Sequence, residues 1–288
     1  MKKIKVLLLG KSNVGKSSLI NYVTDNHSTL VSNKLHATRL STFHEFINGD
    51  YHLHFIDTPG TSISENNLLA QAMRSHASKH ITDCDIIILL TQPQKSYDYE
   101  KKILNDINLC NKQFLICVNK SDLDPERIFS SRLEKHLNTD QYLLMSIKEN
   151  TGLKEFFNQL NAKIDNLDNS SHNQINVNNK TYIIQELIRE SVLQKTNEEV
   201  PYESAVRIIN YRAQKKIDLI SAEIIVSKHN QKKIVVGKDG QMIKIIGTLA
   251  RNKIENLIQK KVHLNLYVLV RDNWKNNPEL LRDFGYIE

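Results

Sequence analysis

Two short motifs that lie far apart in the chain limit what it can fold into. The first occupies residues 10–17 and reads Gly-Lys-Ser-Asn-Val-Gly-Lys-Ser, and the second, at 119–122, reads Asn-Lys-Ser-Asp. A glycine-rich loop with this spacing cradles phosphate groups on its backbone N–H groups. The aspartate of the second motif can accept from two guanine N–H donors at once, so the two motifs together predict a guanine nucleotide site.

The composition is that of a globular protein large enough for two domains. Of the 288 residues, 40% are hydrophobic and 25% are charged, which excludes a disordered or fibrous chain. No stretch approaches the roughly 20 apolar residues of a membrane span, so we expect no integral membrane segment. Cys84, Cys110 and Cys117 lack metal-ligand spacing and are expected to be buried thiols of a reducing compartment.

Short apolar runs alternate with polar helical stretches through the first half of the chain. Strands buried on both faces read as continuous apolar runs, and their alternation with helices indicates a parallel sheet covered on both sides. The predicted fold class is therefore α/β, a P-loop domain with a mostly parallel sheet. The expected strands are 4–9, 51–56, 86–90, 114–118 and 142–145.

The first motif follows the first expected strand, at the sheet edge where open α/β sheets collect their ligands. Lys16 is expected to reach the β- and γ-phosphate oxygens, and Ser17 to give its hydroxyl oxygen to Mg²⁺. The helix that follows presents its positive N-terminus to the same anion. The residues assigned to GTP binding here are Gly10, Lys11, Ser12, Asn13, Val14, Gly15, Lys16, Ser17 and Ser18.

A third motif, Asp-Thr-Pro-Gly at 57–60, ends the second expected strand. Asp57 is placed to hold Mg²⁺ through a water molecule, and the Gly60 amide to sense the γ-phosphate. Thr38 is the candidate for the threonine that completes the metal shell in the GTP state. Four nearby hydroxyl residues leave that assignment open: Thr24, Ser32, Ser41 and Thr42. The remaining residues assigned to GTP binding here are Thr58, Pro59 and Thr61.

The base is expected to be read by the second motif. Asp122 discriminates strongly because adenine would leave its charged carboxylate unpaired. Asn119 and Lys120 are expected to tie this loop to the phosphate loop and to cover the guanine face. A backbone N–H from the segment after the last strand would reach the guanine oxygen. The assigned residues are Asn119, Lys120, Ser121, Asp122, Ser146, Ile147 and Lys148.

A polar stretch without periodicity, near 165–179, is read as a linker. It gives a GTPase domain at 1–167, a linker at 168–181 and a second domain at 182–288. The order expected in the second domain is a helix at 182–195, strands at 205–211 and 217–226, two helices flanking a turn, and a strand at 262–270. This order resembles an α+β KH module of type II.

The turn of that module reads Gly-Lys-Asp-Gly at 237–240. Glycines at both ends let a nucleotide strand approach the backbone closely, and neighbouring basic side chains neutralise phosphate. Residues 182–288 hold 18 Lys+Arg against 13 Asp+Glu and so carry most of the net charge of +7. The residues assigned to RNA binding are Lys232, Lys233, Gly237, Lys238, Asp239, Gly240, Lys244 and Arg251.

With these residues in place, the chain resembles the Era family, bacterial GTPases that join a Ras-like G domain to a C-terminal KH domain. The resemblance rests on the motifs at 13–19, 57–60, 199–202 and 236–240, and on the tail from Trp274 to Tyr286. It implies binding of small-subunit (16S) ribosomal RNA by the GTP form and a role in small ribosomal subunit assembly. It also implies a cytoplasmic protein with peripheral contact to the inner membrane.

The chain departs from that family at several positions. Ser12 stands where relatives usually carry proline, the segment 35–38 reads Leu-His-Ala-Thr, and Ser146-Ile147 replaces Ser-Ala. Thr61 occupies the position where Ras-like enzymes place a water-orienting glutamine. Asn13 matches an asparagine that helps to hold a potassium ion in related GTPases, which makes potassium activation a hypothesis.

We therefore expect a slow, Mg²⁺-dependent GTPase switch that converts GTP and water to GDP and phosphate. The alternative is an RNA-binding assembly factor that uses GTP only as a structural ligand. Intact Lys16, Ser17 and Asp57 favour the enzyme, whereas Thr61 and the unusual switch segment keep the alternative open.

Overall fold

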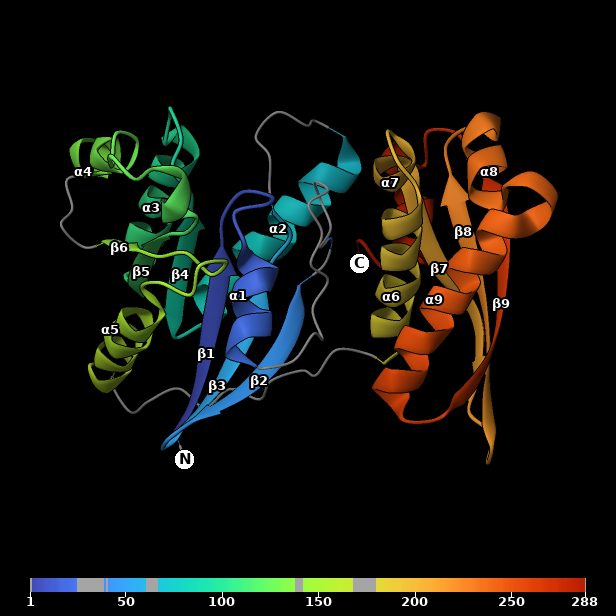
Figure 1. Ribbon diagram of the computed structural model, residues 1–288, viewed down its shortest axis with the longest axis horizontal. Helices are drawn as coiled ribbons and strands as arrows, with labels where there is room; N and C mark the ends of the chain where they lie inside the picture. Colours follow the sequence, from blue (N-terminus) through green and yellow to red (C-terminus); the bar gives the residue numbers. More distant parts are fainter. Residues whose placement is uncertain are drawn as a thin grey trace. The chain divides into compact units, whose positions relative to one another are not determined.

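Separate hydrophobic cores divide the chain into two structural units (Figure 1). Unit 1 includes the described residues of 1–31, 38–66 and 73–176, and unit 2 includes those of 67–72 and 177–288. The computed structural model describes residues 2–24, 39, 41–60, 67–137, 142–167 and 180–287.

Unit 1 is built on a six-stranded sheet with the order β2-β3-β1-β4-β5-β6. All neighbouring strands are parallel except β2, which runs antiparallel to β3. The strands are β1 (Lys2–Leu9), β2 (Thr42–Asn48), β3 (Tyr51–Asp57), β4 (Ile86–Thr91), β5 (Gln113–Val118) and β6 (Tyr142–Leu144). The prediction of a mostly parallel sheet is confirmed.

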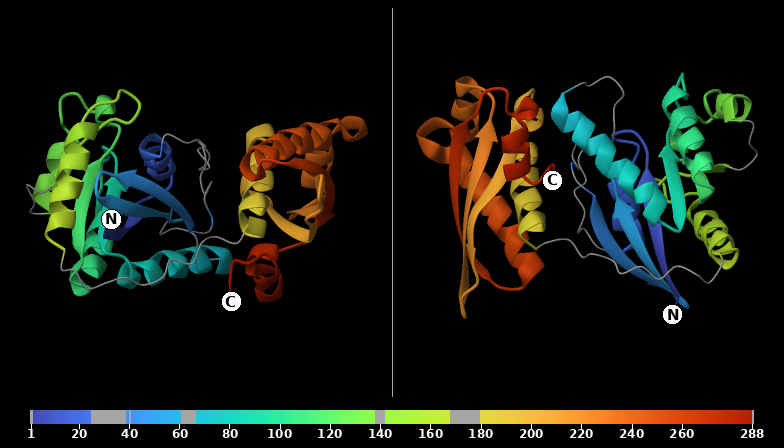
Figure 2. Two further views of the ribbon diagram at one scale, coloured as in Figure 1. Left: turned by 90° about the horizontal axis from the view of Figure 1, so that it is seen from below. Right: turned by 180° about the vertical axis from the view of Figure 1, so that it is seen from behind.

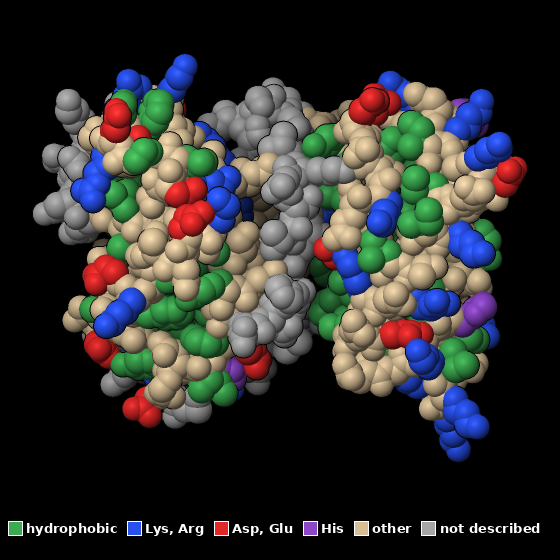
Figure 3. All heavy atoms as spheres, in the orientation of Figure 1, with side chains coloured by type: hydrophobic (Ala, Val, Ile, Leu, Met, Phe, Trp, Pro, Cys, Tyr) green, Lys and Arg blue, Asp and Glu red, His purple; other side chains and the backbone are tan. Residues whose placement is uncertain are grey.

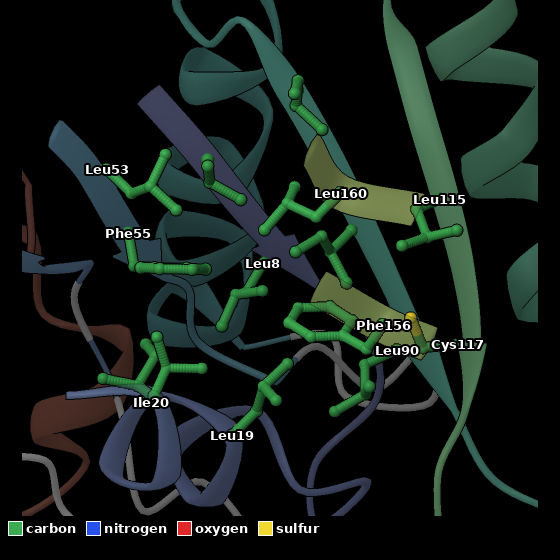
Figure 4. Packing of buried hydrophobic residues seen from close by; sticks show 14 of the residues in the cluster. Leu8, Leu19, Ile20, Leu53, Phe55, Leu90, Leu115, Cys117, Phe156 and Leu160 are labelled. Carbon is green, nitrogen blue, oxygen red and sulfur yellow. The ribbon is translucent and has the colours of Figure 1, made fainter. Parts of the chain in front are cut away.

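Helices cover both faces of this sheet, as Figure 2 shows for α1 and α2. On one face, α1 (Lys16–Val23) and α5 (Leu153–Asp165) supply Leu19, Ile20, Phe156 and Leu160 to a core shared with Leu8 and Phe55 (Figure 4). The other face packs against α2 (Leu68–Asp83), α3 (Asp98–Leu109) and α4 (Ser130–Leu137). Alternate residues of β1 enter the two cores, which explains its continuous apolar run.

Unit 2 has the element order expected of a KH module. Its helices are α6 (Lys180–Lys195), α7 (Val200–Glu203), α8 (His229–Val236), α9 (Gln241–Ile258) and α10 (Pro278–Asp283), and its strands are β7 (Ser204–Arg212), β8 (Ile217–Val226) and β9 (Lys261–Val270). In the order β7-β8-β9, the first pair is antiparallel and the second parallel. Residues of α6 and α9 pack with this sheet in one core.

Several element boundaries differ by one or two residues from the sequence-based expectation, such as those of β1, β4 and β5. Helix α6 begins at Lys180, inside the predicted linker, because Lys180 and Thr181 continue the helix that buries Ile184 and Ile188. Strand β6 ends at Leu144, and Met145 directs its buried side chain into the unit 1 core beyond the strand. No helix within the described ranges is long and apolar enough to cross a membrane.

Candidate nucleotide site and nucleic-acid interface

The phosphate-loop sequence connects β1 to α1, with its glycines where the backbone needs them. Gly15 has φ 105°, and a Cβ atom added to it would lie 2.3 Å from Asn119 Nδ2. Any larger residue would therefore push the loop away from the 119–122 motif. The loop leads directly into α1 at Lys16, so the N-terminus of this helix faces the space that the loop encloses.

Lys16 is held over the loop by two of the loop's own carbonyl groups. Its Nζ donates to the oxygen of Gly10 at 3.0 Å and to that of Lys11 at 2.9 Å. Burial lowers the pKa of Lys16 to about 8, and the nearby Asp57 carboxylate opposes this shift. A cation fixed in this way needs little rearrangement to meet an anionic phosphate.

Ser17 and Asp57 meet although 40 residues separate them in the chain. Ser17 Oγ donates to Asp57 Oδ2 at 2.6 Å, and Asp57 is 1% exposed. A hydroxyl and a carboxylate oxygen side by side fit Mg²⁺, which takes few protein oxygens and completes its shell with water and phosphate. These two residues could therefore hold the ion. Thr38, the third predicted ligand, lies outside the described residues.

The alternatives to Thr38 are placed differently from one another. Thr24 Oγ1 donates to the Ile20 carbonyl at 2.8 Å, and Thr42 Oγ1 lies 2.9 Å from His44 Nε2. Ser41 is 8% exposed, and its Oγ has no hydrogen-bond partner among the described residues. Ser32 lies outside the described residues. The local bonds of Thr24 and Thr42 make them poorer candidates for a metal ligand.

The 57–60 segment contacts the phosphate loop directly. Ser12 Oγ donates to the Gly60 carbonyl at 2.9 Å, and Thr58 Oγ1 donates to the Leu8 carbonyl at 2.5 Å. The bond from Thr58 fixes this segment to β1. Thr61 lies outside the described residues.

The base-selecting motif is tied to the phosphate loop by two side chains. Asn119 Nδ2 donates to the Val14 carbonyl at 2.8 Å, and Lys120 Nζ donates to the Asn13 carbonyl at 2.6 Å. Asn119 is 3% exposed, so removal of its amide would leave buried groups unsatisfied. Burial lowers the pKa of Lys120, against the effect of Asp122.

Asp122 is oriented by the segment that follows β6. Ser146 Oγ donates to Asp122 Oδ1 at 2.6 Å, which fixes the carboxylate and leaves lone pairs for a ligand. The backbone N–H groups of Ser146 and Ile147 donate to Thr151 O at 3.0 Å and to Asn119 Oδ1 at 3.1 Å. These bonds fix the backbone of the 146–148 segment beside Asp122.

Val14 and Lys148, both assigned to GTP binding, have side chains that contact other parts of the protein. Val14 belongs to the hydrophobic core, and Lys148 Nζ forms an ion pair with Glu149 at 2.8 Å. Val14 can therefore serve a nucleotide only through its backbone, whereas Glu149 and then the base-site carboxylate of Asp122 raise the pKa of the exposed Lys148. The structure brings the backbones of 10–18, 57–60, 119–122 and 146–148 to the carboxyl ends of β1, β3, β5 and β6, where each segment follows its strand.

A buried glutamate lies beside the phosphate loop, and no pattern in the sequence indicated it. Glu100 of α3 is 0% exposed. Its Oε1 accepts from Thr91 Oγ1 and from Gln94 Nε2, each at 2.8 Å, and its Oε2 lies 3.7 Å from Lys11 Nζ. Lys11 Nζ also donates to Gln94 Oε1 at 3.1 Å. Glu100 therefore fixes the Lys11 side chain against α3.

In unit 2, the Gly-Lys-Asp-Gly turn joins α8 to α9. Lys238 and Asp239 are both exposed, and Asp239 adopts φ 50°. The predicted basic residues lie on the flanking helices, Lys232 and Lys233 on α8 and Lys244 and Arg251 on α9, and all but the half-buried Lys232 are exposed. Lysine and arginine side chains are spread over the face of unit 2 shown in Figure 3.

Comparison with known proteins agrees with the GTPase interpretation of the first half of the chain and the KH interpretation of the second. A family model described as a 50S ribosome-binding GTPase matches residues 5–120, and one described as a KH domain matches residues 199–275. GTPase Era of Helicobacter pylori (strain P12) is 33% identical over 291 residues, which cover 98% of this chain and 95% of that protein. The chain belongs to the Era family of GTPases.

Further Era proteins match along the whole length. GTPase Era of Fusobacterium nucleatum subsp. nucleatum is 33% identical over 298 residues, with 100% of both chains covered. A structure of Era in complex with MgGDPNP and nucleotides 1506–1542 of 16S ribosomal RNA superposes with a TM-score of 0.89 at 26% identity and full coverage of both chains. Aquifex aeolicus Era bound to GDP·AlF₄⁻ gives a TM-score of 0.88 at 27% identity, again with full coverage of both chains. The predicted family and fold class are confirmed.

Proposed function

We propose that this Era family GTPase is a slow molecular switch, in which GTP binding and hydrolysis in residues 1–167 control RNA binding by the domain that begins with α6 at Lys180. The observation that carries the proposal is the convergence of Lys16, Ser17, Asp57 and Asp122 around one enclosing loop. These residues supply the cation, the metal ligands and the base-selecting carboxylate that a GTPase needs.

The protein's part in hydrolysis follows from this arrangement. Backbone N–H groups of the phosphate loop and the N-terminus of α1 hold the phosphates, and the fixed ammonium group of Lys16 stabilises charge on the transferred phosphoryl group. An in-line attack by water on the γ-phosphate then yields GDP and phosphate. Asp122 and a backbone N–H of the 146–148 segment select guanine over adenine.

Ser17 and Asp57 would hold Mg²⁺, with Thr38 as a further ligand. The ion supplies positive charge that neutralises the developing negative charge between the phosphates. Asn13 is our candidate for a potassium ligand, since it matches an asparagine that helps to hold a potassium ion in related GTPases. Potassium would supply transition-state charge that an arginine supplies elsewhere.

For unit 2 we propose binding of small-subunit ribosomal RNA, and a role in assembly of the small ribosomal subunit precursor. The support is the KH match and the full-length similarity to an Era that holds a fragment of 16S ribosomal RNA. One family model carries a large-subunit name, but it covers only part of unit 1, whereas the RNA-bound structure covers the whole chain. We further propose a cytoplasmic protein with peripheral inner-membrane contact, on the family resemblance alone.

GTP turnover with and without Mg²⁺, potassium and RNA tests the enzymatic part. We expect turnover by the wild type in Mg²⁺, faster with potassium, and its loss in Lys16→Ala. Binding without turnover under every condition would favour the alternative, in which GTP is only a structural ligand.

RNA affinity at two salt concentrations tests the other part. Lys238→Asp should cost about 1–3 kcal/mol, roughly a factor of 5–150, and flatten the salt dependence, because it places negative charge against phosphate. Lys215→Asp is the matched control, since it makes the same charge change elsewhere in unit 2. Lys215 precedes β8 in the chain, whereas the Gly-Lys-Asp-Gly turn comes after the end of that strand. Equal effects of the two variants would move the RNA contact elsewhere.

A further inference from the structure

The hairpin of β2 and β3 carries three potential metal ligands on one face. Glu45 of β2 is paired directly with His54 of β3, and His52 lies two residues before His54 on the same strand. Because side chains alternate along a strand, the two histidines point to the same side of the sheet. Glu45 points to that side as well, since directly paired residues of neighbouring strands share a face. The described parts of the chain contain no other such cluster of three histidine, cysteine or acidic residues.

The distances between the ligand atoms are close to those that a bound metal ion would require. Glu45 Oε2 is 3.3 Å from His52 Nε2, and Glu45 Oε1 is 3.6 Å from His54 Nδ1. All three ligand atoms lie within 4.8 Å of one another. Ligands of a tetrahedral zinc ion, each about 2.0–2.2 Å from the metal, are separated by about 3.3 Å. Small side-chain rotations would therefore bring the set into coordination distance.

The surroundings suit an open site with one fixed ligand. His54 is 4% exposed, whereas the side chains of His52 and Glu45 are 21% and 61% exposed. Burial, followed by the neighbouring His52, lowers the pKa of His54. The exposed side of the cluster provides an entry path and space for water as a fourth ligand.

Two positive charges weaken the site. Lys3 and Lys5 of β1 pair in register with His52 and His54, and both lysines contribute to the lowered pKa of His54. Cross-strand glutamate and histidine pairs also occur without any metal. The lysines have long, mobile side chains, so we expect a reversible site rather than a permanently occupied structural one.

We propose that Glu45, His52 and His54 bind a late first-row divalent metal ion, which the chemistry of these ligands identifies as zinc. This site is separate from the Mg²⁺ site proposed at Ser17 and Asp57. Two imidazoles and a carboxylate with an open fourth position suit zinc rather than Mg²⁺. Strand β2 is at one end of the strand order of the described sheet. A bound ion would therefore tie an edge strand to its only neighbour in that sheet.

Zinc and cobalt(II) titrations of the full chain test this proposal, with excess Mg²⁺ and GDP present to fill the nucleotide site. We expect about one zinc per chain, and cobalt absorption typical of a tetrahedral site with nitrogen and oxygen ligands. His52→Ala and Glu45→Gln change exposed or half-buried side chains, and each should weaken zinc binding at least about tenfold. Zinc should also raise the unfolding temperature of the wild type but not of Glu45→Gln.

His44→Ala is the matched control, since His44 belongs to the same hairpin but alternates to the other face of β2. Cys110→Ser controls for binding by the half-buried thiol. Both controls should bind zinc like the wild type, and GDP affinity should be unchanged in every variant. Zinc binding lost equally in His44→Ala and His52→Ala, or absent from the wild type at about 0.1 mM metal, would overturn the proposal.

Discussion

The hydroxyl of Ser12 donates to the carbonyl of Gly60 at 2.9 Å and joins the phosphate loop to the segment that follows β3. The contact is close on the backbone side as well, since a Cβ atom added to Gly60 would lie 2.5 Å from Ser12 Cα and 2.6 Å from Ser12 N. Proline, the usual family residue at this position, has no such hydroxyl. The bond holds Gly60 beside the phosphate loop.

Ser12→Ala should therefore weaken binding of a non-hydrolysable GTP analogue and leave GDP binding unchanged. A net hydrogen bond contributes about 0.5–1.5 kcal/mol, so we expect a loss of roughly 2- to 12-fold. Fluorescence titration with both nucleotides measures the ratio. Ser131→Ala, which removes an exposed hydroxyl bonded to the Ile128 carbonyl at 3.2 Å, is the control. An equal change in affinity for GDP and the analogue would argue against a role for this bond in the GTP state.

Asp122→Asn should reverse the base preference from GTP towards xanthosine triphosphate. The new amide can donate to the second xanthine oxygen, which replaces the guanine amine. Competition between the two nucleotides measures the preference, and a variant that still prefers GTP would show that Asp122 does not read the base.

Ser146→Ala separates the orientation of the Asp122 carboxylate from its recognition of the base. It removes the hydroxyl that fixes Asp122 Oδ1 at 2.6 Å but keeps the carboxylate. We expect weaker GTP binding, by about 1.5–3 kcal/mol because the acceptor is charged, with no gain in affinity for xanthosine triphosphate. A switch of base preference in this variant would mean that Asp122 acts differently from our assignment.

How far the sequence predicted the fold depended on where each strand lies. β1, β4 and β5 are covered on both faces and read as continuous apolar runs. β2 lies at one end of the sheet, and its His44, Glu45 and Asn48 interrupt any such run, so the pattern gave no strand there. The short α10 was missed for another reason, since it depends on packing of Trp274 and Phe284, which contact each other edge-on.

The nucleotide motifs could be located in advance because their chemistry depends on residues adjacent in sequence. Glu100 could not, because its role requires burial beside Lys11 and Thr91, which come from other parts of the fold. The bond between Ser12 and Gly60 was hidden for the same reason. Local spacing identifies a loop, whereas contacts between loops require the tertiary structure.

The lowered pKa of Lys16 predicts that GDP affinity decreases above about pH 8. Near pH 7, Lys16 is charged with or without nucleotide. Above its pKa the free protein has a neutral Lys16, while bound phosphates restore the charge, so binding takes up a proton. Affinity should then fall by up to about tenfold per pH unit.

Calorimetric titration in two buffers of different ionisation enthalpy measures this uptake, at about pH 7 and about pH 8.5. Burial also lowers the pKa of Lys120, and Lys120→Arg, which stays charged, removes that contribution. Proton uptake that is the same at both pH values would show that Lys16 does not titrate in this range.

The two glycines of the Gly-Lys-Asp-Gly turn should respond differently to alanine. Gly237 and Gly240 have φ 74° and 75°, where a side chain costs about 1–2 kcal/mol. A Cβ on Gly237 would also lie 2.6 Å from Met242 Cβ and 2.8 Å from Met242 N, whereas one on Gly240 meets nothing within 4 Å. Gly237→Ala should therefore destabilise unit 2 more than Gly240→Ala does.

Trp274 makes this comparison specific, because it is the single tryptophan of the chain and lies buried in unit 2. Its fluorescence during urea unfolding reports on that unit, while GDP affinity reports on unit 1 and should not change. If a nucleotide strand approaches the turn, the methyl group of Gly240→Ala enters the space that the strand needs, and RNA affinity should fall by more than the small stability loss explains. RNA affinity equal to that of the wild type in a folded Gly240→Ala would place the strand elsewhere on unit 2.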